Sequence, residues 1–356
     1  MSVALPEDLA LLLALARARS ASDLHLGAGA PPHLRRNGTL IPLESGPIPS
    51  ESLESFLGRL LDDQTRARLE HDGEVDAVIA DTPGGRVRVW AGRSESGPVL
   101  VVRLLPPLVP TLEDLHAPFA VRGLAGLREG LVLLTGTAGA GKTTTQAALV
   151  DAINRAGGRH VMSVEDPVEI RHVPLGGPIT QRQVGRDTES LAQGLRSALR
   201  ADPDVLVVGE VRDGETLGLA LQAAGSGLLV LATLHAPSAP GAVERVLSLF
   251  PLERRESARE ALAGCLAAAV HQRLLPARNE GRVACFSVML GTTAVRAAIR
   301  DGQERQLGAL MDIGRGQGML PADDDFARLR DSELLPPETR EDEATGNTAR
   351  LRTGRV

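Results

Sequence analysis

The segment from Gly136 to Thr143 reads Gly-Thr-Ala-Gly-Ala-Gly-Lys-Thr and has the spacing of a phosphate-binding P-loop. Its glycines allow the backbone N–H groups to turn inward around phosphate oxygens. Lys142 is expected to reach the β and γ phosphates, and the Thr143 hydroxyl to ligate Mg²⁺. The pattern therefore predicts a nucleotide site formed by Gly136, Thr137, Ala138, Gly139, Ala140, Gly141, Lys142, Thr143 and Thr144.

Acidic residues follow two apolar segments that read as strands. Glu210 ends the run 205–208, and Glu165 with Asp166 ends the run 161–164. Strand ends of this kind carry the ligand groups of doubly wound sheets. Glu210 is predicted to help hold Mg²⁺ and position water, with a solvated cap as the alternative. Glu165 or Asp166 is a candidate general base or metal ligand, with a charged surface turn as the alternative.

Thr233 and His235 follow a third apolar run, 228–232. A hydroxyl and an imidazole at this place could sense a γ-phosphate. The alternative is a structural role, which is commoner for a single histidine. The spacing alone leaves both interpretations open.

The elements that must position these groups alternate between apolar strands and helices. The loop follows a strand at 131–134 and precedes a helix at 144–155, and further helices are expected at 191–199 and 215–224. Continuous apolar strands alternating with helices indicate a parallel sheet covered on both faces. This region is therefore predicted to have an α/β fold.

The chain before residue 106 has a different pattern. Residues 7–19 read as an amphipathic helix, and short strands are expected at 23–26, 33–36, 75–80, 86–90 and 99–104, which indicate a small α+β module. Three prolines in the segment 106–111 predict a linker. The expected domains are 1–105, the linker 106–111, 112–320, and an acidic mobile tail 321–356.

Composition excludes several classes of protein. The chain has 356 residues and 39 basic ones, of which only Lys142 is a lysine; it has no Tyr, one Trp and five Phe. A net charge of −6 with so few aromatic residues argues against nucleic-acid binding. Two distant cysteines predict neither a disulfide framework nor a zinc site. We expect a cytoplasmic protein with no transmembrane segment.

Strings along residues 7–310 together resemble those of the secretion and pilus ATPases, most closely the PilT-like retraction ATPases. Besides the P-loop they are Ala21-Ser22-Asp23-Leu24-His25-Leu26, Pro31-Pro32, Val164-Glu165-Asp166-Pro167-Val168-Glu169, Gln181-Arg182, Arg186-Asp187-Thr188, Leu195-Arg196-Ser197-Ala198-Leu199-Arg200, Asp202-Pro203-Asp204, Val208-Gly209-Glu210-Val211-Arg212-Asp213 and Thr233-Leu234-His235.

This resemblance implies a hexameric ring in which an N-terminal PAS-like domain precedes a RecA-like P-loop ATPase domain. It also implies ATP and Mg²⁺ as ligands, Glu165 as the catalytic base, Glu210 at the magnesium and water, and His235 as the histidine-box residue. Arginines of the N-terminal domain approach the nucleotide, and the matching candidates here are Arg86, Arg88 and Arg103. The implied location is the cytoplasm, peripheral to the inner membrane at the pilus platform protein.

Three departures from the PilT-like pattern bear on activity. Leu228 stands where a second histidine is expected, Ser96 stands where an N-terminal-domain arginine is expected, and residues 294–300 only approximate the retraction motif. The first two changes predict slower hydrolysis or altered coupling between subunits. Retraction is therefore a less direct expectation than ATP hydrolysis.

Other functions remain open at this stage. The first is a pilus assembly or type II secretion ATPase, although such proteins usually carry a longer N-terminal region and a four-cysteine zinc module. The second is a retraction-accessory paralogue with weak hydrolysis. A nucleic-acid translocase and a nucleotide-binding scaffold without turnover are the more distant alternatives.

Overall fold

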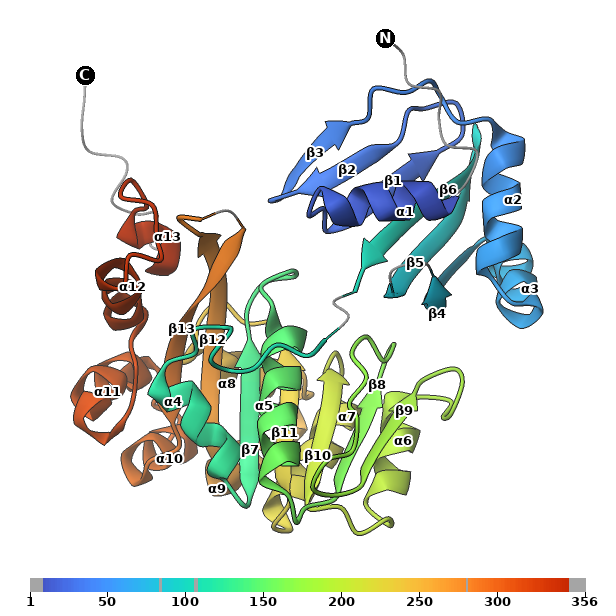
Figure 1. Cartoon of the computed structure of the whole chain (residues 1–356). Helices are drawn as coiled ribbons and strands as arrows, with labels where there is room; N and C mark the ends of the chain where they lie inside the picture. The colour runs from blue at the N-terminus through green and yellow to red at the C-terminus, as the bar shows by residue number, and fades with distance from the viewer. Residues whose placement is uncertain (1–8, 83–84, 106–107, 280, 346–356) are drawn as a thin grey trace. The chain divides into compact units, whose positions relative to one another are not determined.

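The computed structural model describes residues 9–82, 85–105, 108–279 and 281–345, and the chain divides into two compact units between Leu108 and Val109 (Figure 1). This division falls inside the segment 106–111 that the sequence predicts to be a linker. Residues 106 and 107, as well as 1–8 and 346–356 of the expected terminal segments, lie outside the described residues.

The N-terminal unit contains a six-stranded antiparallel sheet of order β3-β2-β1-β6-β5-β4. Its elements are α1 (Leu9–Ala18), β1 (Asp23–Gly27), β2 (His33–Arg36), β3 (Thr39–Pro42), α2 (Ser50–Leu60), α3 (Asp63–Asp72), β4 (Glu74–Thr82), β5 (Gly85–Ser94) and β6 (Gly97–Leu104).

Alternation along β5 explains how this sheet forms one core. Val87, Val89 and Ala91 are fully buried, whereas the intervening Arg88 and Trp90 are more exposed. The buried side chains join apolar residues of α1 and α2 in a single cluster. The five expected strand segments lie within β1, β2, β4, β5 and β6, whereas β3, α2 and α3 were not expected from the sequence.

The second unit is an α/β structure around a seven-stranded sheet of order β13-β12-β7-β11-β10-β8-β9. Its strands are β7 (Gly130–Thr135), β8 (Val161–Glu165), β9 (Ile179–Gln183), β10 (Val205–Glu210), β11 (Leu229–Leu234), β12 (Leu266–Pro276) and β13 (Arg282–Leu290). The expectation of a purely parallel sheet is wrong at one edge, because β13 is antiparallel to β12. The other neighbouring strands are parallel.

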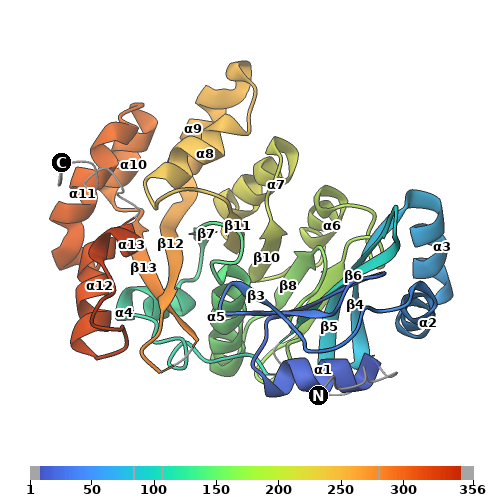
Figure 2. The same ribbon diagram turned by 90° about the horizontal axis from the view of Figure 1, so that it is seen from above.

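Helices cover both faces of this sheet (Figure 2). They are α4 (Phe119–Arg122), α5 (Lys142–Ala156), α6 (Leu191–Ala198), α7 (Gly214–Gly225), α8 (Gly241–Ser248), α9 (Arg255–Cys265), α10 (Thr293–Arg300), α11 (Leu307–Ile313), α12 (Ala322–Asp331) and α13 (Glu341–Thr345), with 3₁₀ turns at Gly123–Gly126, Leu252–Arg254, Glu304–Gln306 and Gly314–Gln317.

The residues of β7 alternate between the two cores. Leu131 and Leu133 belong to the apolar cluster that includes α6, α7, α8 and α9 on one face, whereas Val132 and Leu134 belong to the cluster that includes α5 on the other. A strand buried on both faces must be apolar at every position, which accounts for the continuous run in the sequence. This burial gives the phosphate loop a rigid starting point.

The expected mobile tail is wrong for residues 322–345. This segment forms α12 and α13, and Phe326, Leu329 and Ala344 are buried against Leu275 and Val283 of the β12–β13 pair. The fully buried Asp325 accepts hydrogen bonds from the Phe286 backbone N–H at 2.8 Å and from Arg328 at 2.6 Å. The acidic residues that suggested a mobile segment include Asp323, Asp324 and Asp325 in the first turn of α12, where the helix dipole favours negative charge.

The tail also holds the segment that leads in from the linker. Arg328 Nη2 donates to the carbonyl oxygen of His116 at 2.9 Å, across 212 residues of sequence. Helices α12 and α13 are therefore packed parts of the second unit.

Replacing the fully buried Leu329 by alanine is expected to lower the free energy of unfolding by about 2–5 kcal/mol, because the lost side chain leaves a cavity. Asp331→Ala, at the exposed end of the same helix, is the matched control. Chemical denaturation followed by circular dichroism measures both. Equal stability of the two variants would contradict the packed tail.

No helix in the described part of the chain combines the length and the hydropathy needed to cross a membrane.

Candidate active site

The phosphate loop connects the buried end of β7 to the first residue of α5. Gly136, Gly139 and Gly141 have φ angles of 148°, 73° and 87°, a region that residues with a Cβ atom rarely adopt. The glycine spacing thus gives a loop whose backbone turns inward at the start of a helix, where N–H groups and the helix dipole attract anions. This conformation fits a nucleotide's phosphates.

Lys142 is the first residue of α5 and is only 8% exposed. Its ammonium donates hydrogen bonds to the carbonyl oxygens of Gly136 at 3.1 Å and Thr137 at 2.9 Å. Burial lowers the pKa of Lys142, and the negative charge of Glu210 partly opposes that shift. The only primary ammonium side chain in the sequence is therefore held on the phosphate loop.

Glu210 and His235 come together at the ends of β10 and β11. Glu210 pairs with His235 Nε2 and also accepts from Arg212 Nε at 2.8 Å. His235 Nδ1 lies 3.0 Å from the Gly136 carbonyl oxygen, on the opposite side of the ring from the nitrogen that pairs with Glu210. Burial would raise the pKa of Glu210, but Arg212 together with His235 and Lys142 holds it below its usual range.

Glu165 lies at the end of β8 and lines the same small cavity as Thr143. Its Oε1 accepts hydrogen bonds from the Ser163 hydroxyl at 2.7 Å and from Gln181 Nε2 at 3.2 Å. The carboxylate is thus oriented by one donor on its own strand, β8, and one on the neighbouring β9. Of the two acids that the sequence left open at this strand end, Asp166 is exposed, whereas Glu165 lines the cavity.

Thr233, considered with His235 as a phosphate sensor, has a different environment. Its side chain is only 4% exposed, and its hydroxyl donates to the Gly209 carbonyl oxygen at 3.2 Å. Thr233 therefore joins β11 to the strand end that carries Glu210.

The three candidate arginines of the N-terminal unit lie on β5 and β6. Arg88 and Arg103 are register partners on these adjacent strands. Arg88 donates from Nε and Nη2 to the carboxylate of Asp76, and Arg103 Nε donates to Asp23 at 2.9 Å. Arg86 lies two residues before Arg88 on β5.

The positions that depart from the PilT-like pattern are also defined. Ser96 is exposed in the turn between β5 and β6. Leu228 is partly buried and packs against the apolar core that includes residues of α7. Its carbonyl oxygen accepts a hydrogen bond from the Gly130 backbone N–H at 3.0 Å. At this position the chain has a packing residue before β11.

Two contributors to the site were not predicted from the sequence. Gln146, one turn after Lys142 on α5, donates to the carbonyl oxygens of Val208 at 3.1 Å and Leu231 at 3.0 Å. It fastens the helix to β10 and β11, which carry Glu210 and His235. The second is Arg212, whose contact with Glu210 two residues earlier has no separate signal in the sequence.

His271 on β12 is a buried group behind the loop. Thr135 Oγ1 lies 3.3 Å from its Nδ1, and Arg273 Nε lies 3.4 Å from its Nε2. Burial, with the positive charges of Arg273 and Lys142, lowers the pKa of His271 from 6.5 to about 4. The imidazole is thus neutral in the folded protein at pH 7.

This shift predicts a loss of stability on acidification. Because the folded pKa lies below the unfolded value, the contribution of His271 to stability is full above pH 6.5, falls as the pH drops from 6.5 to about 4, and changes no further below that. Between pH 7 and pH 4 this group should remove about 3 kcal/mol from the free energy of unfolding. In denaturation curves recorded at both pH values, His271→Gln should lose less unfolding free energy between pH 7 and pH 4 than wild type. Equal losses in the two proteins would show that His271 is not the group responsible.

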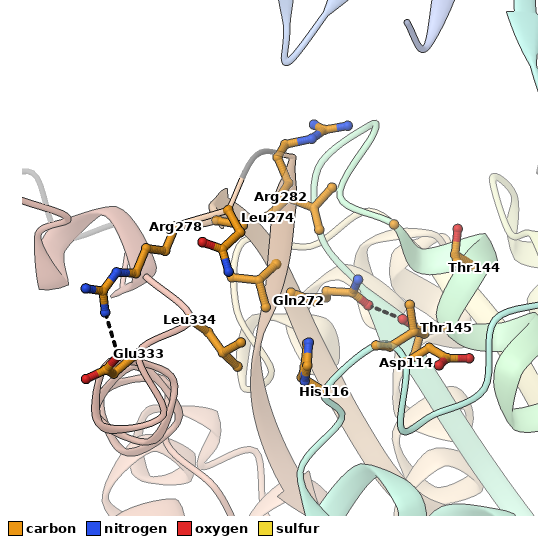
Figure 3. Close-up of a pocket in the computed structure, with 16 residues that line it drawn as sticks. Asp114, His116, Thr144, Thr145, Gln272, Leu274, Arg278, Arg282, Glu333 and Leu334 are labelled. Carbon is orange, nitrogen blue, oxygen red and sulfur yellow. Dashed lines mark hydrogen bonds and ion pairs between the residues drawn. The ribbon is translucent and has the colours of Figure 1, made fainter. Parts of the chain in front are cut away.

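A hollow of about 360 Å³ borders the other side of the loop (Figure 3). Gly141, Thr144 and Thr145 line it together with Asp114 and His116, and Arg278 of the β12–β13 turn and Arg282 at the start of β13 complete it. Glu333, two residues after the end of α12, pairs with Arg278 at 2.8 Å. The tail thus contributes to the surroundings of the phosphate loop.

The site has a glycine-rich loop between a buried strand and a helix, and acidic residues at the ends of adjacent strands. These features define a P-loop nucleotide-binding protein. Residues 19–307 match the family described as type II/IV secretion system protein. The type IV pilus retractation ATPase PilT of Pseudomonas aeruginosa PAO1 is 37% identical over 317 residues, 89% of this chain and 92% of its own. The chain therefore belongs to the type II/IV secretion system protein family, among its PilT-like members.

Further similarities agree with this placement. The Escherichia coli K12 protein YggR, described as uncharacterized, is 40% identical over 309 residues, 87% of this chain and 94% of its own. A crystal structure of the pilus retraction motor PilT with bound ADP has a TM-score of 0.81 at 34% identity, covering 93% of this chain and 95% of that one. The resemblance inferred from the sequence strings is confirmed.

Proposed function

We propose that this protein is an ATPase that powers type IV pilus retraction, and hence twitching motility, by driving pilin removal at an inner-membrane platform protein. One observation carries the enzymatic part: Thr143 follows the buried Lys142 on α5, and Glu165 lines the same cavity as Thr143. The phosphate loop therefore lies next to the Glu165 carboxylate, which two hydrogen-bond donors orient. The similarity to PilT supports the pilus system as the setting.

The residues fit the roles of a P-loop hydrolase. Lys142 would exchange its two loop carbonyls for β and γ phosphate oxygens of ATP. Glu165 would accept the proton of the attacking water, and Glu210, held by Arg212 and His235, would help position that water. Thr143 and Glu210 would hold Mg²⁺, which supplies charge neutralisation at the phosphates when bound.

The proposed assembly is a homo-hexamer in the cytoplasm, peripheral to the inner membrane. In this assembly the N-terminal unit is a PAS-like domain and the second unit is a RecA-like domain. Neither domain binds nucleic acid. Arg86, Arg88 and Arg103 would contact a nucleotide across a subunit boundary, since the guanidinium fork suits phosphate oxygens. Arg88 and Arg103 would then have to leave Asp76 and Asp23.

An accessory role in retraction with weak hydrolysis is the second candidate. It rests on Leu228, whose side chain packs against the core and offers no donor to a phosphate. In this case the ring would work beside a faster motor. Assembly and type II secretion remain alternatives within the same enzyme class.

Two measurements together test the proposal. The purified chain should hydrolyse ATP in the presence of Mg²⁺, and cells lacking it should be over-piliated and unable to twitch. Bald cells would indicate assembly instead, and an unchanged phenotype would favour the accessory role. No turnover in any assembled form would overturn the enzymatic part.

A further inference from the structure

Gln272 on β12 is only 3% exposed and contacts the start of the phosphate loop. β12 runs parallel to β7, and the register that pairs His271 with Thr135 places Gln272 beside Gly136. A Cβ atom on Gly136 would lie 2.5 Å from the Gln272 carbonyl oxygen. The first loop residue therefore rests directly on the backbone of Gln272.

The side chain of Gln272 reaches the other end of the same loop. Its Oε1 accepts a hydrogen bond from the Thr145 hydroxyl at 2.7 Å, and Thr145 is fully buried in the first turn of α5 (Figure 3). A Cβ atom on Gly141 would lie 2.7 Å from Gln272 Nε2. One residue thus contacts the first glycine, the last glycine and the helix that follows.

We infer that Gln272 is a positioning residue that sets the distance between the two ends of the phosphate loop. It acts on phosphate binding through Gly136, Gly141 and Thr145 rather than by contact with the reacting atoms. Backbone N–H groups bind phosphate well only when they converge, so a shift of either end weakens several hydrogen bonds together. The inference rests on the proposed nucleotide site and names a residue that determines its shape.

The choice of glutamine follows from what the site requires. The Thr145 hydroxyl is buried, and losing its acceptor would leave a polar group without this partner. The carbonyl end of glutamine supplies that acceptor, while the planar amide fits against the bare Cα of Gly141. Leucine would occupy a similar volume but could not accept from Thr145.

The test compares variants in the full-length protein. Gln272→Leu and Thr145→Val should each raise the KM for ATP about tenfold, with kcat changing less than about threefold, and the double variant should resemble either single one. Thr145→Ser retains the hydroxyl and should restore KM to within about twofold of wild type. Gln306→Leu, the same substitution at an exposed position, is the control.

Binding of ADP, measured by calorimetry, separates the possible failures. If wild type binds ADP and both variants bind it equally well, the positioning role is overturned while the nucleotide site stands. Additive effects in the double variant, or lower melting temperatures with unchanged KM, would also overturn it. Absence of nucleotide binding by wild type would overturn both the inference and the proposed function.

Discussion

Lys142→Ala is expected to reduce ATP turnover by about a hundredfold or more, because it removes the positive charge at the β and γ phosphates. Arg155→Ala, which removes a positive charge from the other end of α5, should leave turnover near wild type. Turnover is measured as phosphate release at saturating ATP and Mg²⁺. Equal rates for the two variants would exclude Lys142 from catalysis.

A second substitution at this position isolates shape from charge. Lys142→Arg keeps the charge, but the broader guanidinium must fit among the carbonyl oxygens of Gly136 and Thr137, where the ammonium now lies. Turnover should therefore fall although the net charge is unchanged. An Arg variant as active as wild type would show that charge alone suffices.

Glu165→Gln is expected to lower kcat by about 10²–10⁴-fold while leaving ATP binding largely intact, because the amide cannot take a proton from water. Glutamine is isosteric and can still accept from Ser163 and Gln181, so the cavity beside Thr143 should persist. Single-turnover kinetics together with equilibrium binding separate the two effects.

The control for this substitution is Glu129→Gln, at an exposed position just before β7. It should change neither kcat nor binding. Unchanged turnover in Glu165→Gln would remove Glu165 from the role of base and leave Glu210 as the carboxylate to test. Loss of ATP binding in Glu165→Gln would instead indicate that the carboxylate shapes the pocket.

The P-loop and the strand ends could be predicted because their signals are local. Continuous apolar residues, glycines at fixed spacing and the acids after two of the strands are all visible within short windows of sequence. β12 was missed for the opposite reason: His271, Gln272 and Arg273 interrupt its apolar run, and their partners include Thr135 and Thr145, more than 120 residues away. Contacts of this kind are determined by the sheet order, which the sequence does not display.

The expectation of a mobile tail is wrong because the acidic composition of residues 321–345 hides the helical spacing of their apolar residues. Phe326 and Leu329 are three residues apart and lie on one helical face, but the neighbouring acids suggested a solvated segment. The same acids favour the start of α12 through the helix dipole. A short amphipathic helix with an acidic first turn and a disordered acidic segment thus look alike in composition.

The anchoring of His116 has a mechanical consequence. Residues 106–111 are the covalent route by which a pull on the N-terminal unit would reach the second unit, and Arg328 holds the His116 carbonyl just beyond that route. Asp114 and His116 line the hollow that Gly141 and Thr144 also border. The point at which the covalent connection enters the second unit is therefore tied both to the last helices, through Arg328, and to the border of the phosphate loop, through Asp114 and His116.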